Sequence, residues 1–138
     1  GSLDNIEVVK SFGEQVPPVL ADPDQMKQVL INLFLNAAQA MPSGGRLTTE
    51  VSAHLDRVEI EVKDTGCGIE QGELERIFDP FFTTKERGAG LGLSIVRRIV
   101  DAHKGTISAQ STVREGTTIT VSLPTRARLQ EDGAYSLS

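Results

Sequence analysis

The stretch VEIEVKDTGCGI, residues 58–69, joins an alternating run to a glycine-containing turn. Apolar and charged residues alternate in its first half, which predicts a strand with one buried face. Asp64 ends this strand, and Gly66 and Gly68 leave space beside it because they carry no side chain. A buried carboxylate must accept hydrogen bonds, since an unpaired buried charge is costly. The donor would be either the backbone of the following turn or a ligand, for which an exocyclic amine on a flat ring is suitable.

The same periodicity predicts the elements on either side. The predicted strands cover residues 6–10, 47–55, 58–63, 106–111 and 117–123. One long helix is predicted from an N-cap at Asp22 to Met41. A second is predicted from about Gly92 to His103, with Gly105 as its C-cap. A short helix is predicted at 73–78. This order favours an α+β fold, a two-layer α/β sandwich with a mixed, mostly antiparallel sheet and about three helices on one face.

The chain of 138 residues fits one domain. We interpret residues 1–2 as a cloning scar, 3–124 as the folded domain and the polar segment 125–138 as a flexible C-terminal tail. No run approaches 18 apolar residues, so no membrane helix is predicted. A single cysteine, Cys67, excludes an internal disulfide and favours a reducing, cytoplasmic setting.

The net charge of −5 argues against a nucleic-acid groove, which needs a basic surface. The charge is uneven, however. Residues 1–80 carry 6 basic and 14 acidic side chains, whereas residues 81–138 carry 8 basic and 5 acidic ones. The basic part begins at Lys85, beside a second glycine cluster, GAGLGL at 88–93. An anionic ligand near this cluster and a solvated basic surface are both consistent with the pattern.

The second glycine cluster matches neither the dinucleotide fingerprint nor the Walker A loop. Glycines nevertheless allow a backbone to approach phosphate oxygens, and the N–H groups that open the following helix would point at them. The alternative is a mobile loop without a ligand.

Asn32 and Asn36 lie four residues apart, and therefore share one face of the first long helix. Buried amides need partners. One interpretation is a pair of structural hydrogen bonds to neighbouring loops, and the other is an amide oxygen that coordinates Mg²⁺ beside phosphates. His54 lies in a predicted strand with no acidic residue at catalytic spacing, and His103 lies near a helix end, where a histidine interacts favourably with the helix dipole. We interpret both as structural.

Taken together, these motifs resemble the catalytic and ATP-binding domain of sensor histidine kinases, in the superfamily shared with gyrase and the heat-shock chaperone. The similarity covers residues 3–124 and is typical of the subgroup related to nitrogen-regulation sensors. The matching motifs, in order, are NLFLNAAQAM (32–41, the N box), DTGCGI (64–69, the first G box), FDPFFTTK (78–85, the F box), GAGLGL (88–93, the second G box) and REGTTITVSLP (114–124, the closing strands).

The resemblance implies a role for each matching residue. Asp64 would accept a hydrogen bond from the adenine amine of ATP, and Asn36 would hold Mg²⁺. Asn32, close to the phosphates, and Lys85, on the lid, are the implied catalytic residues. The remaining implied nucleotide-binding residues are Gly66, Gly68 and Ile69 around the base, Gly88, Gly90, Leu91 and Gly92 in the lid, and Thr117 or its neighbour Thr118 behind the adenine.

Two departures bear on the chemistry. In the gyrase branch a glutamate four residues before the magnesium asparagine activates water, whereas this chain has Asn32 there. An amide is a poor base, so the γ-phosphate would be kept for a better nucleophile. A basic residue common after the magnesium asparagine is replaced by Gln39, so phosphate charge would be met by Lys85 or Arg87.

The implied function is ATP:protein-histidine phosphotransfer in a two-component signalling system. No histidine here lies in an acceptor motif and no paired dimerisation helices precede residue 3, so we expect a monomeric fragment whose acceptor histidine is on a separate dimerisation domain. That domain would dock on the F-box side, and a response regulator would follow as the next partner. The alternatives are a gyrase-type ATPase switch and a nucleotide-binding interaction module. Whether the full-length protein is membrane-anchored stays open.

Overall fold

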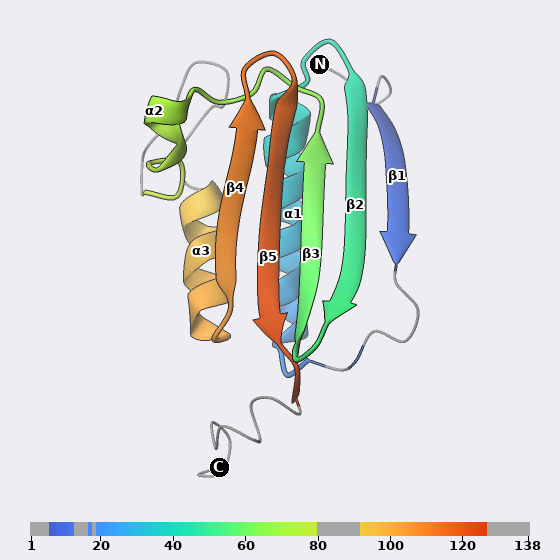
Figure 1. The fold of residues 1–138 in the computed structure, drawn as a ribbon, viewed down its shortest axis with the longest axis vertical. Coiled ribbons are helices and arrows are strands. Elements are labelled where there is room, and N and C mark those ends of the chain that lie inside the picture. The colour runs from blue at the N-terminus through green and yellow to red at the C-terminus, as the bar shows by residue number, and fades with distance from the viewer. Residues whose placement is uncertain (1–5, 13–16, 18, 80–91, 127–138) are drawn as a thin grey trace.

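A single five-stranded sheet forms one layer of the molecule, with strand order β1-β2-β3-β5-β4 (Figure 1). The computed structural model describes residues 6–12, 17, 19–79 and 92–126. The strands are β1 (Ile6–Phe12), β2 (Gly45–His54), β3 (Arg57–Asp64), β4 (Thr106–Thr112) and β5 (Gly116–Pro124). β1 pairs with β2 in parallel, and the other neighbouring pairs are antiparallel. The predicted mixed, mostly antiparallel sheet is confirmed.

Helices form the second layer. α1 (Pro23–Gln39) and α3 (Gly92–Ala102) contact each other and lie on the same face of the sheet (Figure 1). The short α2 (Gln71–Leu74) contacts β4, and the chain continues through turns as far as Phe78. The predicted two-layer α/β sandwich is therefore correct.

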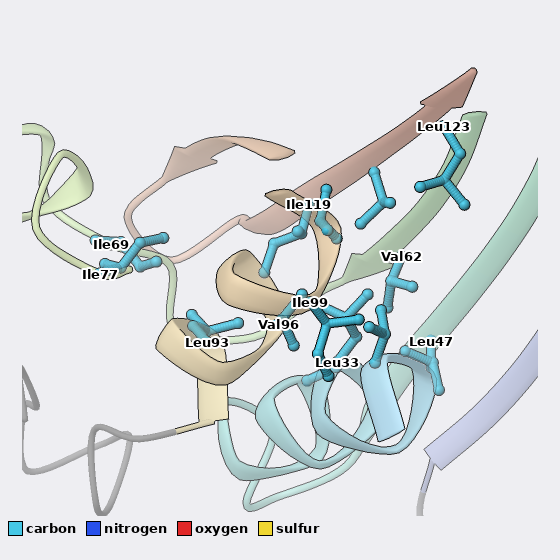
Figure 2. Packing of buried hydrophobic residues seen from close by; sticks show 14 of the residues in the cluster. Leu33, Leu47, Val62, Ile69, Ile77, Leu93, Val96, Ile99, Ile119 and Leu123 are labelled. Atoms are coloured by element: carbon cyan, nitrogen blue, oxygen red, sulfur yellow. The ribbon is translucent and has the colours of Figure 1, made fainter. Parts of the chain in front are cut away.

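The hydrophobic core lies between the two layers (Figure 2). Leu33 of α1 and Val96 of α3 are almost completely buried, as are Val62 and Val121 of the sheet. Successive side chains of a strand point to opposite faces of the sheet. The residues of β3 and β5 that alternate with the buried ones therefore lie on the other face, which is polar and includes Lys63. Among the described residues, no helix combines the length and apolar character needed to cross a bilayer.

α1 begins as predicted and ends earlier than predicted. Asp22 Oδ1 accepts hydrogen bonds from the N–H groups of Asp24 and Gln25, at 2.9 and 3.1 Å, which confirms the N-cap. The helix ends at Gln39 instead of Met41. Ala40 forms the C-cap, and its carbonyl accepts a hydrogen bond from Cys67 N–H at 3.0 Å. The segment after β3 thus takes the place of a further helical turn.

The C-terminus of α3 corrects one prediction. Lys104, not Gly105, has the left-handed backbone, with φ 64°. Lys104 N–H donates to the Asp101 carbonyl and Gly105 N–H to the Val100 carbonyl, at 3.1 and 3.0 Å, which is a Schellman motif. Glycine is needed one position later because a Cβ on Gly105 would lie 2.4 Å from the Ser122 carbonyl oxygen.

His103 has a structural role, as predicted. Its Nε2 accepts a hydrogen bond from Asp22 N–H at 3.1 Å, and its Nδ1 lies 2.8 Å from the Ile99 carbonyl. The ring therefore joins the end of α3 to the start of α1 by hydrogen bonding.

The packed part of the chain extends to Thr125, the first residue assigned to the tail. Thr125 is buried, and its N–H donates to the Asp56 carbonyl at 2.8 Å. Residues 127–138 lie outside the described residues.

Candidate functional site

The candidate site is centred on Asp64, the last residue of β3, which lies on the same sheet face as the core residue Val62. The carboxylate is buried, with 3% of the residue exposed. Its Oδ1 accepts hydrogen bonds from Gly66 N–H at 2.9 Å and from Thr117 N–H at 3.3 Å. The predicted cap of the following turn is thus confirmed. A carboxylate can accept about four hydrogen bonds in all.

The sequence predicts that Gly66 and Gly68 leave space beside Asp64, whereas the structure shows that glycine is needed at these positions for backbone packing. A Cβ on Gly66 would lie 2.3 Å from the Ala40 carbonyl oxygen, and a Cβ on Gly68 would lie 2.2 Å from the Thr112 carbonyl oxygen. These glycines therefore let the loop after β3 pack against the end of α1 and against the β4–β5 hairpin. Gly68 also has φ 76°, which favours glycine. The loop is tied to two elements, and this fixes the Gly66 N–H that orients Asp64.

The two threonines proposed for the adenine lie on opposite faces of β5. Thr117 is directly opposite Asp64 in the β3–β5 register and is 2% exposed. Thr118 is opposite Lys63 and therefore projects from the polar face. The structure brings Thr117 to Asp64 and does not bring Thr118 there.

Ser111, on β4, is a residue that the motifs did not indicate. Its Oγ lies 2.7 Å from Ile69 N, 2.9 Å from the Gly116 carbonyl oxygen and 2.8 Å from Thr117 Oγ1. Ile69 itself is buried in the hydrophobic core. Ser111 occupies an inward position of an alternating strand, where an apolar residue is expected, and that is the sequence signal that identifies it.

Asn32 lies on the part of α1 that faces the start of α3. Asn32 Nδ2 donates to the Gly92 carbonyl at 3.3 Å, and Asn32 Oδ1 accepts from Gln28 Nε2 at 2.9 Å. The predicted structural hydrogen bonding is confirmed for Asn32. Asn36 is partly buried one turn further along. Its amide oxygen is of the type that Mg²⁺ accepts, and Mg²⁺ needs few protein ligands where phosphates supply the others.

Several predicted site residues lie outside the described residues. They are Lys85, Arg87, Gly88, Gly90 and Leu91. Gly92, the last glycine of the second cluster, is the first residue of α3. The described site therefore consists of the ends of β3 and α1, the β4–β5 hairpin and the start of α3.

The fold is a mixed sheet covered on one face by two helices, with a buried acid at the end of β3. Residues 21–127 match the family model described as "Histidine kinase-, DNA gyrase B-, and HSP90-like ATPase". The chain belongs to this family.

Curated relatives are histidine kinases. The chain is 38% identical over 131 residues to Sporulation kinase E of Bacillus subtilis (strain 168), and the match covers 94% of this chain and 18% of the relative. It is 45% identical over 119 residues to Sensor histidine kinase ZraS of Escherichia coli (strain K12), covering 86% of this chain and 26% of the relative. The chain thus spans about a fifth to a quarter of the length of these relatives.

Solved structures agree with this fold. The catalytic domain of histidine kinase ThkA, in a nucleotide-free form, has a TM-score of 0.77 and 36% identity, covering 87% of this chain and 80% of that chain. ThkA in complex with response regulator protein TrrA has a TM-score of 0.74 and 34% identity, covering 87% of this chain and 34% of that chain. The predicted fold class and family are confirmed.

Proposed function

We propose that this chain binds ATP with Mg²⁺ and is the catalytic domain of a sensor histidine kinase. The observation that supports this most directly is Asp64, a buried acid oriented by two backbone N–H groups in a member of this ATPase family. A carboxylate accepts a hydrogen bond from the 6-amino group of adenine. Guanine presents an oxygen at the same position, so ATP is favoured over GTP.

Asn36 is the proposed protein ligand of Mg²⁺, and Asn32 is proposed to lie near the phosphates. The bound ion would neutralise phosphate charge and hold the triphosphate in a reactive position. Gly88, Gly90, Leu91 and Lys85 are proposed to complete the phosphate side of the site. Gly66, Gly68 and Ile69 are proposed to border the base together with Thr117.

The amide of Asn32 favours transfer to a histidine over hydrolysis. Its oxygen already accepts from Gln28 and its nitrogen donates to the Gly92 carbonyl, so both ends of the amide are held by the protein. An amide also has no useful basicity towards water. ATP hydrolysis by this chain alone should therefore be slow, well below the roughly 10 s⁻¹ typical of enzymes.

The acceptor is proposed to be a histidine on a dimerisation domain of the full-length protein, and a response regulator is proposed to receive the phosphoryl group afterwards. The curated relatives, of which this chain spans about a fifth to a quarter, support a longer parent protein. The complex of ThkA with TrrA supports the second partner.

Transfer can be tested directly. The chain is incubated with Mg²⁺, γ-labelled ATP and the separately purified dimerisation domain of its parent protein. The expected product is acid-labile, base-stable label on that domain, with slow phosphate release. Label that never reaches the domain, together with rapid phosphate release, would support a gyrase-type ATPase. ATP binding with neither activity would leave a nucleotide-binding interaction module.

Asn36→Ala is expected to reduce the tightening of ATP binding by Mg²⁺ about tenfold, because one direct ligand of the ion is lost. Calorimetric titration with ATP, in Mg²⁺ and in EDTA, measures this ratio. Gln25→Ala, an exposed residue in the first turn of α1, is the matched control and should match the parent chain. An Asn36→Ala variant with the parental ratio would exclude this role.

A further inference from the structure

Ser111 connects the two segments that orient Asp64. Its Oγ lies 2.7 Å from Ile69 N, in the loop after β3, and 2.9 and 2.8 Å from the Gly116 carbonyl oxygen and Thr117 Oγ1, at the start of β5. The loop supplies Gly66 N–H and β5 supplies Thr117 N–H, the two donors to Asp64 Oδ1. One hydroxyl therefore fixes the separation of the segments that hold the carboxylate from either side.

The donor and acceptor capacity of the Ser111 hydroxyl explains why a side chain without a hydroxyl could not replace it. A serine hydroxyl has one hydrogen to donate and two lone pairs to accept with. It accepts from Ile69 N–H, and its hydrogen has the Gly116 carbonyl and Thr117 Oγ1 within reach. Alanine at this position would leave Ile69 N–H without this partner and would release the Thr117 hydroxyl from its neighbour. Both changes loosen the groups beside Asp64 without touching the carboxylate itself.

We propose that Ser111 is a positioning residue for purine specificity: it aligns Asp64 and Thr117 with the 6-amino group of the base. This inference rests on the proposed function, because it assumes that adenine binds at Asp64. Ser111 acts through Asp64 and Thr117 and is not a catalytic residue.

Binding of two nucleotides distinguishes a role of Ser111 in aligning Asp64 from a role in the general stability of the chain. ATP carries the 6-amino group, and purine riboside triphosphate, its 6-deamino analogue, lacks it. The dissociation constant of the analogue divided by that of ATP measures what the 6-amino group contributes. If Ser111 aligns Asp64, removing its hydroxyl lowers this ratio, because ATP loses affinity while the analogue keeps nearly all of its own. A merely structural residue would weaken both nucleotides alike.

Calorimetry with Mg²⁺ and both nucleotides is the test. Ser111→Ala is expected to lower the ratio about fivefold, as expected for one net hydrogen bond. Ser111→Thr keeps the hydroxyl and should restore most of it. Ser108→Ala is the matched control, because Ser108 is on the same strand but exposed on the opposite face. Should Ser111→Ala fail to fold, Ser111→Cys tests the same point with a side chain of similar size that hydrogen-bonds weakly.

An unchanged ratio in a folded Ser111→Ala or Ser111→Cys variant, or an equal loss of both nucleotides, would overturn the role of Ser111 and leave the proposed function standing. A parent chain that binds ATP no better than the 6-deamino analogue would overturn both, because Asp64 would then not recognise the amine.

Discussion

Asp64→Asn is expected to weaken ATP binding by about 100-fold while the chain stays folded. The asparagine oxygen can keep the two hydrogen bonds from Gly66 N–H and Thr117 N–H that Oδ1 now accepts. Its NH₂ group then takes the place of the second carboxylate oxygen. A donor would face the adenine amine, itself a donor, and a charge-assisted hydrogen bond of roughly 1.5–3 kcal/mol would be lost.

The measurement is calorimetric titration with ATP and with inosine triphosphate, whose 6-position is an oxygen. Asp64→Asn should lose its preference for ATP, because its NH₂ group can donate to that oxygen. Glu61→Gln removes the same charge from the polar face of β3 and should bind both nucleotides as the parent chain does. Parental ATP affinity in Asp64→Asn would refute the adenine assignment, and loss of the folded circular dichroism spectrum would point to a structural role alone.

The two layers of this fold could be predicted from the sequence because their strands and helices follow from patterns among neighbouring residues. Alternation along β3 and β5 and the N-cap at Asp22 are properties of short segments, and the structure confirms them. α1 ends two residues earlier than predicted, and at its C-cap the Ala40 carbonyl accepts a hydrogen bond from Cys67 N–H, a contact between residues far apart in sequence. Likewise, the left-handed position after α3 is taken by Lys104, since Gly105 is required for packing against β5.

The candidate site shows the same division. Asp64 was identifiable because a motif surrounds it, whereas the choice between Thr117 and Thr118 required the register of β3 with β5. Ser111 contacts the loop after β3 across a large separation in sequence, so no local motif contains the hydrogen bond to Ile69. Residues that act through tertiary hydrogen bonds are therefore the part of the site that pattern alone leaves out.

Gly68→Ala is expected to lower the free energy of unfolding by at least about 3 kcal/mol, the range in which steric and backbone strain combine. Gly68 has φ 76°, and a Cβ there would lie 2.2 Å from the Thr112 carbonyl oxygen and 2.8 Å from Val113 Cα. Both contacts are with backbone, which no side-chain rotation relieves. The loop after β3 or the β4–β5 hairpin must move, and either shift disturbs Ser111 and Asp64.

Urea denaturation followed by circular dichroism measures this loss, and Gly72→Ala provides the control. A Cβ on Gly72 would meet no atom within 4 Å, so alanine in α2 should leave the stability unchanged or raise it by up to about 1 kcal/mol. Gly68→Ala should also bind ATP more weakly wherever it remains folded, because the donors to Asp64 move with the loop. Equal stabilities of the two variants would show that the loop after β3 can move without loss of stability. The inference that these contacts hold Asp64 in a fixed position would then be wrong.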